Sequence, residues 1–516
     1  MPQRLKKISG GVEKTASMIV LVLVFGFILY LTLYSFYETS FLSSDDPSGE
    51  RIIYYNDNVF LSIILLTILL LAGYLFYRRC DPIDPRTMEK VLLVWTFLFG
   101  TAYIATTKLR APVFSDSFIV TYGAQRAALG DYAMLEEGYF YRFPFQLGYV
   151  LYSEIFFRIV NIALRGEPEG YAVLALQEVN LLWLLAEFHA LIAITGLLFK
   201  DTRIHRILML MLFFCLQPIL TTPYLYGNIP AFSCGTIAVW MFLRHIKKRS
   251  FKCGLLCAAF LTLGVTLKLN LLIFCVAVGI VWCVMLLKKP SRRSLLCLLL
   301  AAACVLTIPK LPQKLYEYRV GVQYGKGIPM VAWMAMGFSY GHAAPGWYRE
   351  DYTVTAFEHS GRNTAATAEN ARKVLADRLF VFKTDPALTR DFFGEKLRSQ
   401  WNEPSYGSVW LNQVFPSYSL KGMLYVILCG VGARWTLDVM NVYQQFVFLC
   451  LLMGLIRLTQ KKDLLRCLLP LILLGGLLYH LLFEAKSQYA LPYFVMILPI
   501  AAYGLFTLYR KVEFRS

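Results

Sequence analysis

The stretch that decides the fold is Met18-Ile-Val-Leu-Val-Leu-Val-Phe-Gly-Phe-Ile-Leu-Tyr-Leu-Thr-Leu-Tyr-Ser-Phe-Tyr37, which contains no charged side chain. A helix rises about 1.5 Å per residue, so roughly 20 apolar residues cross the hydrocarbon core of a bilayer. Phe60–Tyr77 and Leu92–Thr107 are comparable runs, and many more follow. The sequence therefore predicts an all-α polytopic membrane protein with 12–14 transmembrane helices.

Composition supports the same class. Of 516 residues, 57% are hydrophobic and 16% charged, with a mean hydropathy of +0.54; soluble domains carry about 25% charged residues. The net charge of +18 lies in short connectors such as Arg244–Lys252 and Lys288–Arg293. A basic face with interleaved aromatic residues on a soluble fold is missing, which argues against nucleic-acid binding. Short basic loops stay in the cytoplasm, so these connectors report topology instead.

This charge rule orients the chain. It places Arg4–Lys7 inside, so the first run exits, the second returns to Arg78-Arg79 and the third exits near Lys108. The loop 109–145 is then expected outside, and both termini are expected in the cytoplasm. The first run is long and has no small-residue cleavage site, which is typical of an anchor. Residues 145–199 do not fit this rule, because Arg165 and the basic cluster Lys200–Arg206 are both expected in the cytoplasm. One membrane crossing in this region must therefore be irregular.

The sequence divides into four predicted parts. Residues 309–420 form a connector far longer than usual, and such segments are usually functional. Ala371, Val374, Leu375 and Leu379 recur at helical spacing until Asp385-Pro386 interrupts them, and the segment contains no cysteine to form a disulfide. We expect an N-terminal helix pair at 1–87, a transmembrane core at 88–308 with an outer loop at 109–145, a small mostly helical outer module at 309–420, and C-terminal transmembrane helices at 421–516.

Polar side chains gather in segments that the topology places on one side. Carboxylates, guanidinium groups and tyrosines occur between Lys108 and Gln146, and the last outer turn carries Glu484–Tyr489. The turns Tyr226–Asn228 and Lys268–Asn270 add amides and a cation. A carboxylate base, cations and amides at an interface can activate a hydroxyl and neutralise a phosphate. Transfer of a sugar from a polyprenyl phosphate carrier requires both.

Several short motifs resemble those of the GT-C superfamily of integral-membrane glycosyltransferases, which includes protein O-mannosyltransferases and aminoarabinose transferases. They are Ser115-Asp116 after a helix, the tract Ala127–Tyr132, and the helix start Tyr141-Arg-Phe-Pro144. Gln488-Tyr-Ala-Leu-Pro492 and the turn Tyr226-Gly-Asn228 add to the resemblance. It covers most of residues 88–508 and also looks like a bacterial subgroup with a Trp-rich outer loop. The chain departs from relatives where Gln488 replaces an arginine and Asn228 an acidic residue.

The resemblance implies roles for particular residues. Asp116 would be the catalytic base of an inverting transfer, and Arg142, Lys268 and Lys486 would be candidates for the lipid phosphate. Some members require a divalent cation, but no defined ligand set is visible, and Asp116, Asp131 and Glu484 are only a conjectural one. The remaining substrate-binding candidates are Arg126, Gln146, Gln488, Tyr489, Tyr226 and Asn228, with Asp131 and Glu484 as secondary acidic candidates.

Simpler interpretations compete with these roles. Asp116 could cap a helix, since Asp is a favoured N-cap, and Asp131 could belong to an ordinary turn. Arg126 and Arg142 could extend to lipid headgroups. Glu154 and Arg158, four residues apart, are expected to form an ion pair within one helix.

Three functional classes follow. The favoured one is a glycosyltransferase that moves a sugar from a polyprenyl-phosphate donor to a hydroxyl of a cell-surface glycan or protein, at the outer face of a bacterial plasma membrane. A transporter or flippase of lipid-linked glycans is one alternative, and a non-catalytic assembly partner is another. The sequence shows no internal repeat, and its polar residues gather at one interface and not at the membrane midplane, which favours the enzyme over a transporter.

Overall fold

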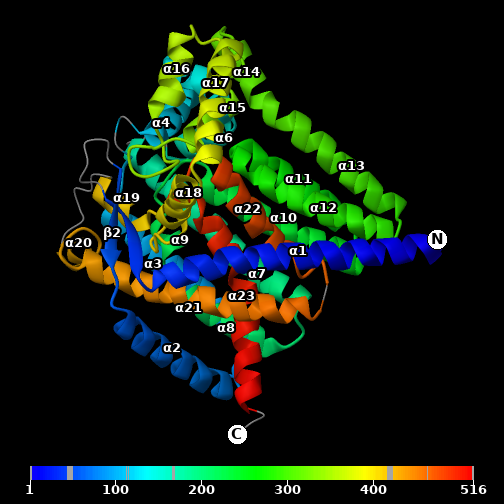
Figure 1. Cartoon of the computed structure of the whole chain (residues 1–516). Coiled ribbons are helices and arrows are strands. Elements are labelled where there is room, and N and C mark those ends of the chain that lie inside the picture. Colours follow the sequence, from blue (N-terminus) through cyan, green and yellow to red (C-terminus); the bar gives the residue numbers. More distant parts are fainter. Residues whose placement is uncertain are drawn as a thin grey trace.

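The computed structural model describes residues 3–43, 50–111, 113, 115–164, 169–414, 422–461 and 463–513. Helices dominate the described chain, and one two-stranded sheet is its only sheet (Figure 1). Nine helical segments of the described residues are long and apolar enough to span a membrane. These spans are carried by α1 (Gln3–Ser35), α2 (Val59–Arg79), α3 (Pro85–Thr107), α7 (Glu169–Leu198), α10 (Asn228–Lys248), α12 (Leu272–Lys288), α13 (Arg292–Thr307), α21 (Ala433–Thr459) and α23 (Leu491–Glu513). The predicted all-α polytopic membrane class is confirmed.

Shorter helices complete the bundle. Two of them, α11 (Phe251–Leu267) and α22 (Leu468–Leu482), are apolar. The irregular region 145–199 contains η2 (Pro144–Gln146), α6 (Leu147–Leu164) and α7. The apolar stretch after Asp201 is divided between α8 (Thr202–Phe214) and α9 (Gln217–Leu220), because the chain leaves helical geometry at Cys215 and Pro218 opens the next turn. Such divided and short helices are why the described residues show fewer long spans than the 12–14 expected.

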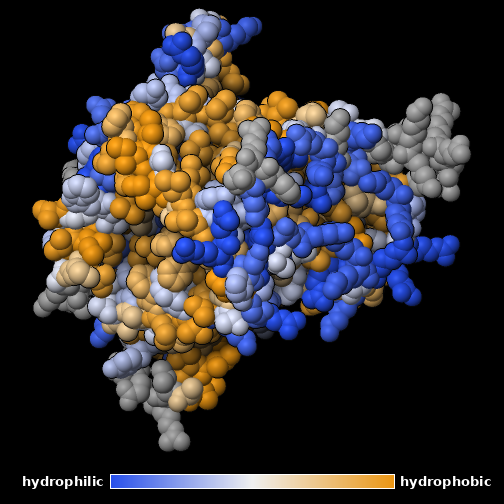
Figure 2. All heavy atoms as spheres, turned by 90° about the horizontal axis from the view of Figure 1, so that it is seen from below, coloured by the Kyte–Doolittle hydropathy of each residue, from blue (hydrophilic) through white to orange (hydrophobic). Residues whose placement is uncertain are grey.

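The helices differ in how deeply they are buried. In the most apolar window of α23, 78% of residues are buried, against 11% in α2, so α23 is central and α2 peripheral. Phe60 and Ile63 of α2 are exposed, as expected for side chains that face lipid. Figure 2 shows hydrophobic side chains over a broad part of the surface, while hydrophilic ones gather toward the end at which the N-terminus lies in Figure 1.

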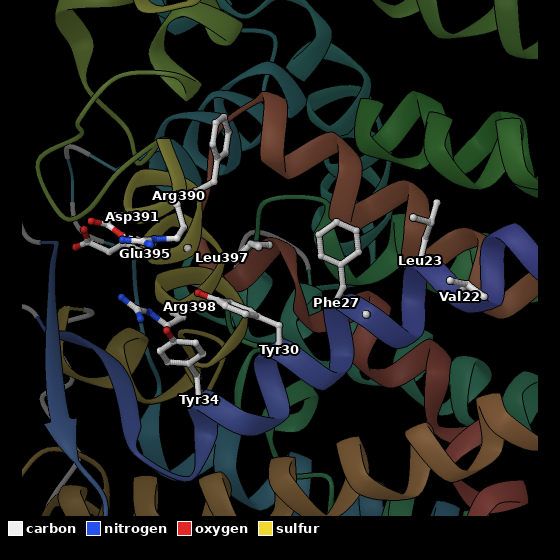
Figure 3. A pocket seen from close by; sticks show the side chains of 13 residues that line it. Val22, Leu23, Phe27, Tyr30, Tyr34, Arg390, Asp391, Glu395, Leu397 and Arg398 are labelled. Atoms are coloured by element: carbon white, nitrogen blue, oxygen red, sulfur yellow. Dashed lines mark hydrogen bonds and ion pairs between the residues drawn. The ribbon is translucent and has the colours of Figure 1, made fainter. Parts of the chain in front are cut away.

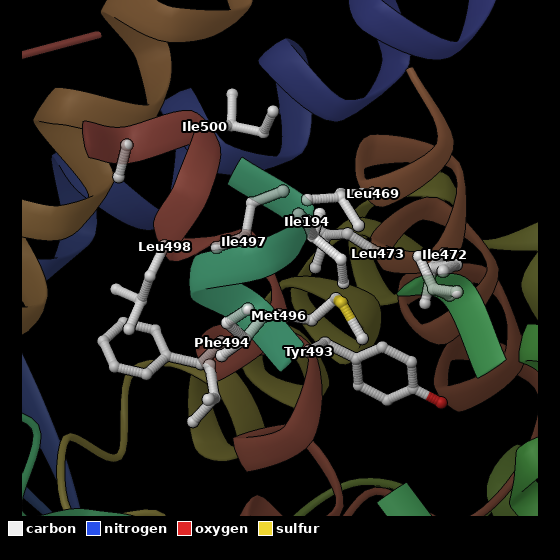
Figure 4. Packing of buried hydrophobic residues seen from close by; sticks show 14 of the residues in the cluster. Ile194, Leu469, Ile472, Leu473, Tyr493, Phe494, Met496, Ile497, Leu498 and Ile500 are labelled. Atoms are coloured by element: carbon white, nitrogen blue, oxygen red, sulfur yellow. The ribbon is translucent and has the colours of Figure 1, made fainter. Parts of the chain in front are cut away.

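The core joins helices distant in sequence. Ile194 of α7, Leu473 of α22 and Ile497 of α23 belong to one buried cluster (Figure 4). Helices α21 and α23 approach so closely that a Cβ on Gly504 would lie 1.9 Å from the Cys450 carbonyl oxygen. Small residues allow this close contact. Membrane helices depend on such packing because, in lipid, the hydrophobic effect does not drive helices to associate.

The N-terminal part contains more than the expected helix pair. Strand β1 (Glu38–Ser43) pairs antiparallel with β2 (Arg51–Asn56), with Glu38 opposite Asn56 and Ser43 opposite Arg51. Tyr54 and its aromatic and β-branched neighbours suit a strand, which the expected helix pair did not include. The hairpin extends from the end of α1 toward residues 386–401 (Figure 1).

Residues 309–420, which we call the polar module, are mostly helical where the structure describes them. Asn363 caps α17 by accepting from the Ala365 and Ala366 amides, and α18 begins at Pro386, so the predicted break at Asp385-Pro386 is confirmed. The module's helices are α14 (Leu311–Val320), α15 (Met330–Gly337), α16 (Val354–His359), α17 (Thr364–Thr384), α18 (Pro386–Trp401) and α19 (Ser408–Val414), with η4 (Ile308–Lys310) before them and η5 (Glu350–Tyr352) among them.

Short helices beside the bundle complete the description. They are α4 (Asp116–Ala128), η1 (Ala133–Glu136), α5 (Gly138–Arg142), η3 (Leu269–Leu271), α20 (Gly422–Leu428) and η6 (Ser487–Tyr489). The expected ion pair in α6 is also present, since Arg158 Nε donates to Glu154 Oε1 at 2.8 Å.

Candidate functional site

Helix α4 presents Asp116 at its first position. Ser115 is the N-cap, and its Oγ accepts from the Phe118 amide at 3.2 Å. The interpretation of Asp116 as the cap is therefore wrong, because Ser115 has that role. An anionic side chain is favourable at the N-terminal end of a helix. The Asp116 residue is exposed, so its carboxylate is accessible.

The turn after α9 faces this carboxylate. Ser117 and Thr121 donate through their hydroxyls to the Leu225 carbonyl at 3.0 and 3.3 Å, which fixes α4 against the turn. Tyr226 then donates its hydroxyl to Asp116 Oδ2 at 2.8 Å. The Tyr139 hydroxyl lies 3.4 Å from that of Tyr226 and extends the contact to α5.

Gly227 brings the same turn against the end of α11. Its φ is +79°, and a Cβ there would lie 2.8 Å from the Leu267 carbonyl oxygen and 3.1 Å from the Tyr149 ring. Glycine adopts positive φ without cost and leaves room for this approach. The next residue after Leu267 is Lys268, whose Nζ lies 3.6 Å from the centroid of the Tyr226 ring.

Lys268 is a buried cation between α11 and η3, with 6% of its surface exposed. Its Nζ also lies 5.8 Å from the Tyr489 ring centroid, so two aromatic faces stabilise the charge. Burial lowers the pKa of Lys268 to about 7, while the carboxylates of Asp116 and Glu484 oppose that change. The ammonium therefore lies in the electrostatic field of the Asp116 carboxylate and gains or loses its proton near neutral pH.

The turn between α22 and α23 supplies the other wall. Burial raises the pKa of Glu484 to about 7, and the neighbouring Lys486 opposes the rise. The Lys486 ammonium pairs with Glu50, which precedes β2. Gln488 hydrogen-bonds the Tyr224 side chain in the Tyr226 turn. Residues from five segments that are distant in the sequence thus share one site.

The polar module holds this last turn through Lys396 of α18. The buried Nζ of Lys396 donates to the carbonyls of Gly337 at 2.5 Å, Leu481 at 3.0 Å and Phe483 at 2.8 Å. These carbonyls belong to the C-terminal ends of α15 and α22, where helices leave carbonyls without a partner and favour a cation. A Cβ on Gly346 would lie 2.3 Å from Lys396 Cε, so glycine leaves room for the lysine.

Further bonds from the module reach the same turn. Gln400 Nε2 donates to the Lys486 carbonyl at 3.2 Å, and the Ala485 amide donates to the Gly346 carbonyl at 2.8 Å. Glu403, which is fully buried, accepts a hydrogen bond from Ser405 Oγ at 2.6 Å and so orders the chain that follows α18. The backbone that carries Glu484, Lys486 and Gln488 is therefore fixed by the module.

A small cavity lies beside the site. Its volume is about 40 Å³, and Tyr224, Asn228, Gln488 and Glu187 are among the residues that line it. The Asn228 Oδ1 atom is buried and has no hydrogen-bond partner in the described structure. A cavity of this size holds about one water, which needs polar partners such as these.

Some predicted residues lie outside the cluster. Arg126 is ten residues beyond Asp116, roughly 15 Å along the helix axis, and its Nε donates to Asp131 Oδ2 at 2.9 Å. Asp131 also accepts from the Ala133 amide at 3.0 Å, as the turn interpretation predicted. Arg142 pairs with Glu358 of the module at 3.1 Å, and Gln146 is buried in η2.

The conjectural metal set is not assembled. Among the described residues, no three His, Cys, Asp or Glu side chains lie close enough together to hold a metal ion. Asp131 is instead engaged by Arg126, which neutralises it locally. Within the described residues, the conjectural ligands Asp116, Asp131 and Glu484 are therefore not brought together.

Most of the residues in this cluster were predicted from the sequence, but two of them were not. Asp116, Tyr226, Lys268, Glu484, Lys486, Gln488 and Tyr489 share the site, with Asn228 at the adjoining cavity. Glu50 and Lys396 were not singled out, because their partners Lys486 and Phe483 lie 436 and 87 residues away in sequence. No local pattern carries such a signal.

Among known proteins, the chain has a distant structural similarity to a solved structure. No family model and no curated protein matches the chain. Among solved structures it is similar to the archaeal oligosaccharyltransferase AglB from Archaeoglobus fulgidus, in complex with an inhibitory peptide and a dolichol-phosphate, with 12% identity and a TM-score of 0.39. The similarity covers 83% of this chain and 52% of that one, so the chain spans about half the length of that protein. Fold and site together define a polytopic helical membrane protein with a charged, tyrosine-lined site where the polar module meets the bundle.

Proposed function

We propose that the protein is a GT-C-type membrane glycosyltransferase that moves a sugar from a polyprenyl-phosphate donor to an acceptor hydroxyl. The observation that carries the proposal is the exposed Asp116 carboxylate, held by the Tyr226 hydroxyl at 2.8 Å beside the Lys268 ammonium. The motifs around Asp116 and Tyr489, which resemble those of the superfamily, support it.

The proposed reaction is a single inverting displacement. Asp116 accepts the proton of the acceptor hydroxyl as its oxygen forms a bond to the anomeric carbon. The bond between that carbon and the donor phosphate oxygen breaks, and its electron pair leaves with the lipid phosphate. Lys268 and Lys486 neutralise the charge that develops on the phosphate, as positioned cations do in a site of low dielectric. Tyr226 keeps Asp116 oriented through Oδ2.

The proposed setting follows from the basic connectors. Both termini would be cytoplasmic, and the polar module and the site would face outward in a plasma membrane, which we propose to be bacterial. A surface glycan or protein would then supply the hydroxyl. The sugar is set by pocket shape, which no motif encodes.

A donor panel tests this function. Purified protein in lipid vesicles would be given polyprenyl-phosphate-linked hexoses, pentoses and aminosugars with a glycan or peptide acceptor mixture. We expect one donor class to be consumed, with inversion of the anomeric configuration measured by NMR. Retention of configuration would contradict the Asp116 mechanism. Movement of an intact lipid-linked glycan across the bilayer without transfer would support the flippase alternative instead.

A further inference from the structure

A groove of about 600 Å³ lies between α1 and α18, apart from the site described above. None of the predicted site residues lines it. Figure 3 shows Phe27, Tyr30 and Tyr34 of α1 on one side, with charged side chains of α18 near them. The groove joins a membrane-spanning helix to the polar module.

The α1 wall of the groove is apolar and opens toward lipid. Val22, Gly26, Tyr30 and Tyr34 recur every four residues and therefore share a helix face. They lie in the apolar span Glu13–Ser35, and 58% of the Val22 surface is exposed. An alkyl chain can lie along this wall without leaving the hydrocarbon region.

The α18 rim carries a pre-positioned guanidinium group. The Arg398 guanidinium carbon lies 4.4 Å from the Tyr34 ring centroid, and the Arg398 carbonyl accepts from Ser40 Oγ at 3.0 Å. Its only ion pair in the described structure is to Glu38 at 3.7 Å, longer than a hydrogen bond. The Nε atom that faces Glu38 is buried and has no hydrogen-bond partner among the described residues, so a ligand would meet the terminal nitrogens of the guanidinium group. A guanidinium held in this way is suited to a phosphate.

The same rim carries carboxylates. Asp391 is highly exposed and pairs with Arg390 at 3.0 Å, and Glu395 accepts from the Tyr54 hydroxyl at 3.3 Å. Two arginines and two carboxylates line the rim, so a purely anionic headgroup meets as much repulsion as attraction. A headgroup with both a phosphate and an ammonium meets a partner for each charge.

We propose that this groove binds a zwitterionic membrane phospholipid with a primary ammonium headgroup. One acyl chain lies against Val22 and Phe27, the phosphate contacts Arg398, and the ammonium contacts Asp391 and Glu395. The bound lipid ties α18, and with it the polar module, to the bilayer.

Two glycines provide a matched test. A Cβ on Gly26 or on Gly279 meets nothing within 4 Å, so both positions accept a larger side chain. Gly26 lines the groove, whereas Gly279, on α12, does not. Gly26→Leu therefore fills the groove, while Gly279→Leu is its control. Arg398→Gln removes the proposed phosphate contact.

The measurement is retention of phosphatidylethanolamine, phosphatidylcholine and phosphatidylglycerol by the purified protein, titrated in detergent and read by native mass spectrometry. We expect phosphatidylethanolamine to bind best. Arg398→Gln should weaken its binding roughly tenfold, because one charge-assisted hydrogen bond is lost. Gly26→Leu should weaken it as well, because the new side chain occupies the wall against which the acyl chain lies. Gly279→Leu should bind as the intact protein does. Equal retention of all three lipids would overturn the proposal. So would equal loss in both glycine variants, or displacement of the lipid by polyprenyl phosphate, which would assign the groove to the donor.

Discussion

Tyr226 connects the two charged groups on which the proposed chemistry depends. Its hydroxyl donates to Asp116, and the face of its ring lies 3.6 Å from the Lys268 ammonium. Tyr226→Phe removes the hydrogen bond but keeps the ring over Lys268. We expect a roughly tenfold lower kcat, since one hydrogen bond to a charged group is lost, with little change in the KM for the donor. A change in the donor KM alone would contradict the role of Tyr226 in orienting the base.

Lys268 and Glu484 make the site sensitive to pH near neutrality. Burial lowers the pKa of Lys268 and raises the pKa of Glu484, each to about 7. As pH rises through 7, either group loses a proton, and both losses make the site more negative. The KM for an anionic lipid-phosphate donor should therefore rise between pH 6 and pH 8.

Lys268→Met checks the origin of that pH effect. It removes the buried cation while keeping the length of the side chain, so the donor KM should be high at pH 6 and change less with pH. Steady-state kinetics at several pH values measures this. Lys383→Met, an exposed lysine of α17, is the control. An unchanged pH profile in Lys268→Met would contradict the assignment.

At the scale of elements, two turns bring the site together. Gly227 has positive φ and lies against the Leu267 carbonyl, whereas Gly130 has φ +86° with nothing near its Cβ position. Alanine at either glycine strains the backbone by about 1 kcal/mol, but only Gly227→Ala also collides with α11. We expect both variants to lose a few degrees in Tm, and only Gly227→Ala to lose most activity. Equal activities would show that the turn does not position Tyr226 and Lys268.

Lys396 of α18 holds the turn between α22 and α23, which is the second turn that forms the site. Lys396→Met removes three hydrogen bonds to the C-terminal ends of α15 and α22. Because Lys486 and Gln488 follow in the same turn, we expect donor KM to rise about tenfold or more, beyond what Lys383→Met causes. If the two variants show the same donor KM, the module does not position this turn. Lys396→Arg, which keeps the charge, should restore part of the donor affinity.

Some of these elements could be predicted from the sequence, and others could not. The length of the apolar runs identified the membrane helices, and Asp385-Pro386 marked the boundary between α17 and α18. The hairpin β1–β2 was missed because six-residue strands beside an acidic loop give a weak local signal. Charged residues next to apolar runs located Asp116, Lys268 and Glu484. Glu50 and Lys396 could not be found, because their roles arise from contacts between segments far apart in the chain.

At the scale of the whole molecule, α23 is central, α2 is peripheral, and the polar module meets the bundle where the charged residues gather. Chemistry at such a junction suits substrates that are half lipid and half polar, because the bundle can accept the carrier while the module shapes the polar side. The alternative of a transporter places its site near the midplane between repeats. The exposed Asp116 and the turn that carries Lys486 lie instead at the junction with the module.

The most direct test of the central claim compares Asp116→Asn with Asp131→Asn in proteoliposomes. Both changes remove one carboxylate near α4, but Asp131 lies outside the cluster and pairs with Arg126. Release of polyprenyl phosphate from the donor would be measured in the presence of acceptor. Loss of a general base lowers the rate about 10² to 10⁴-fold, so Asp116→Asn should fall by that factor while Asp131→Asn stays close to the intact protein. Undiminished release by folded Asp116→Asn protein would contradict the account.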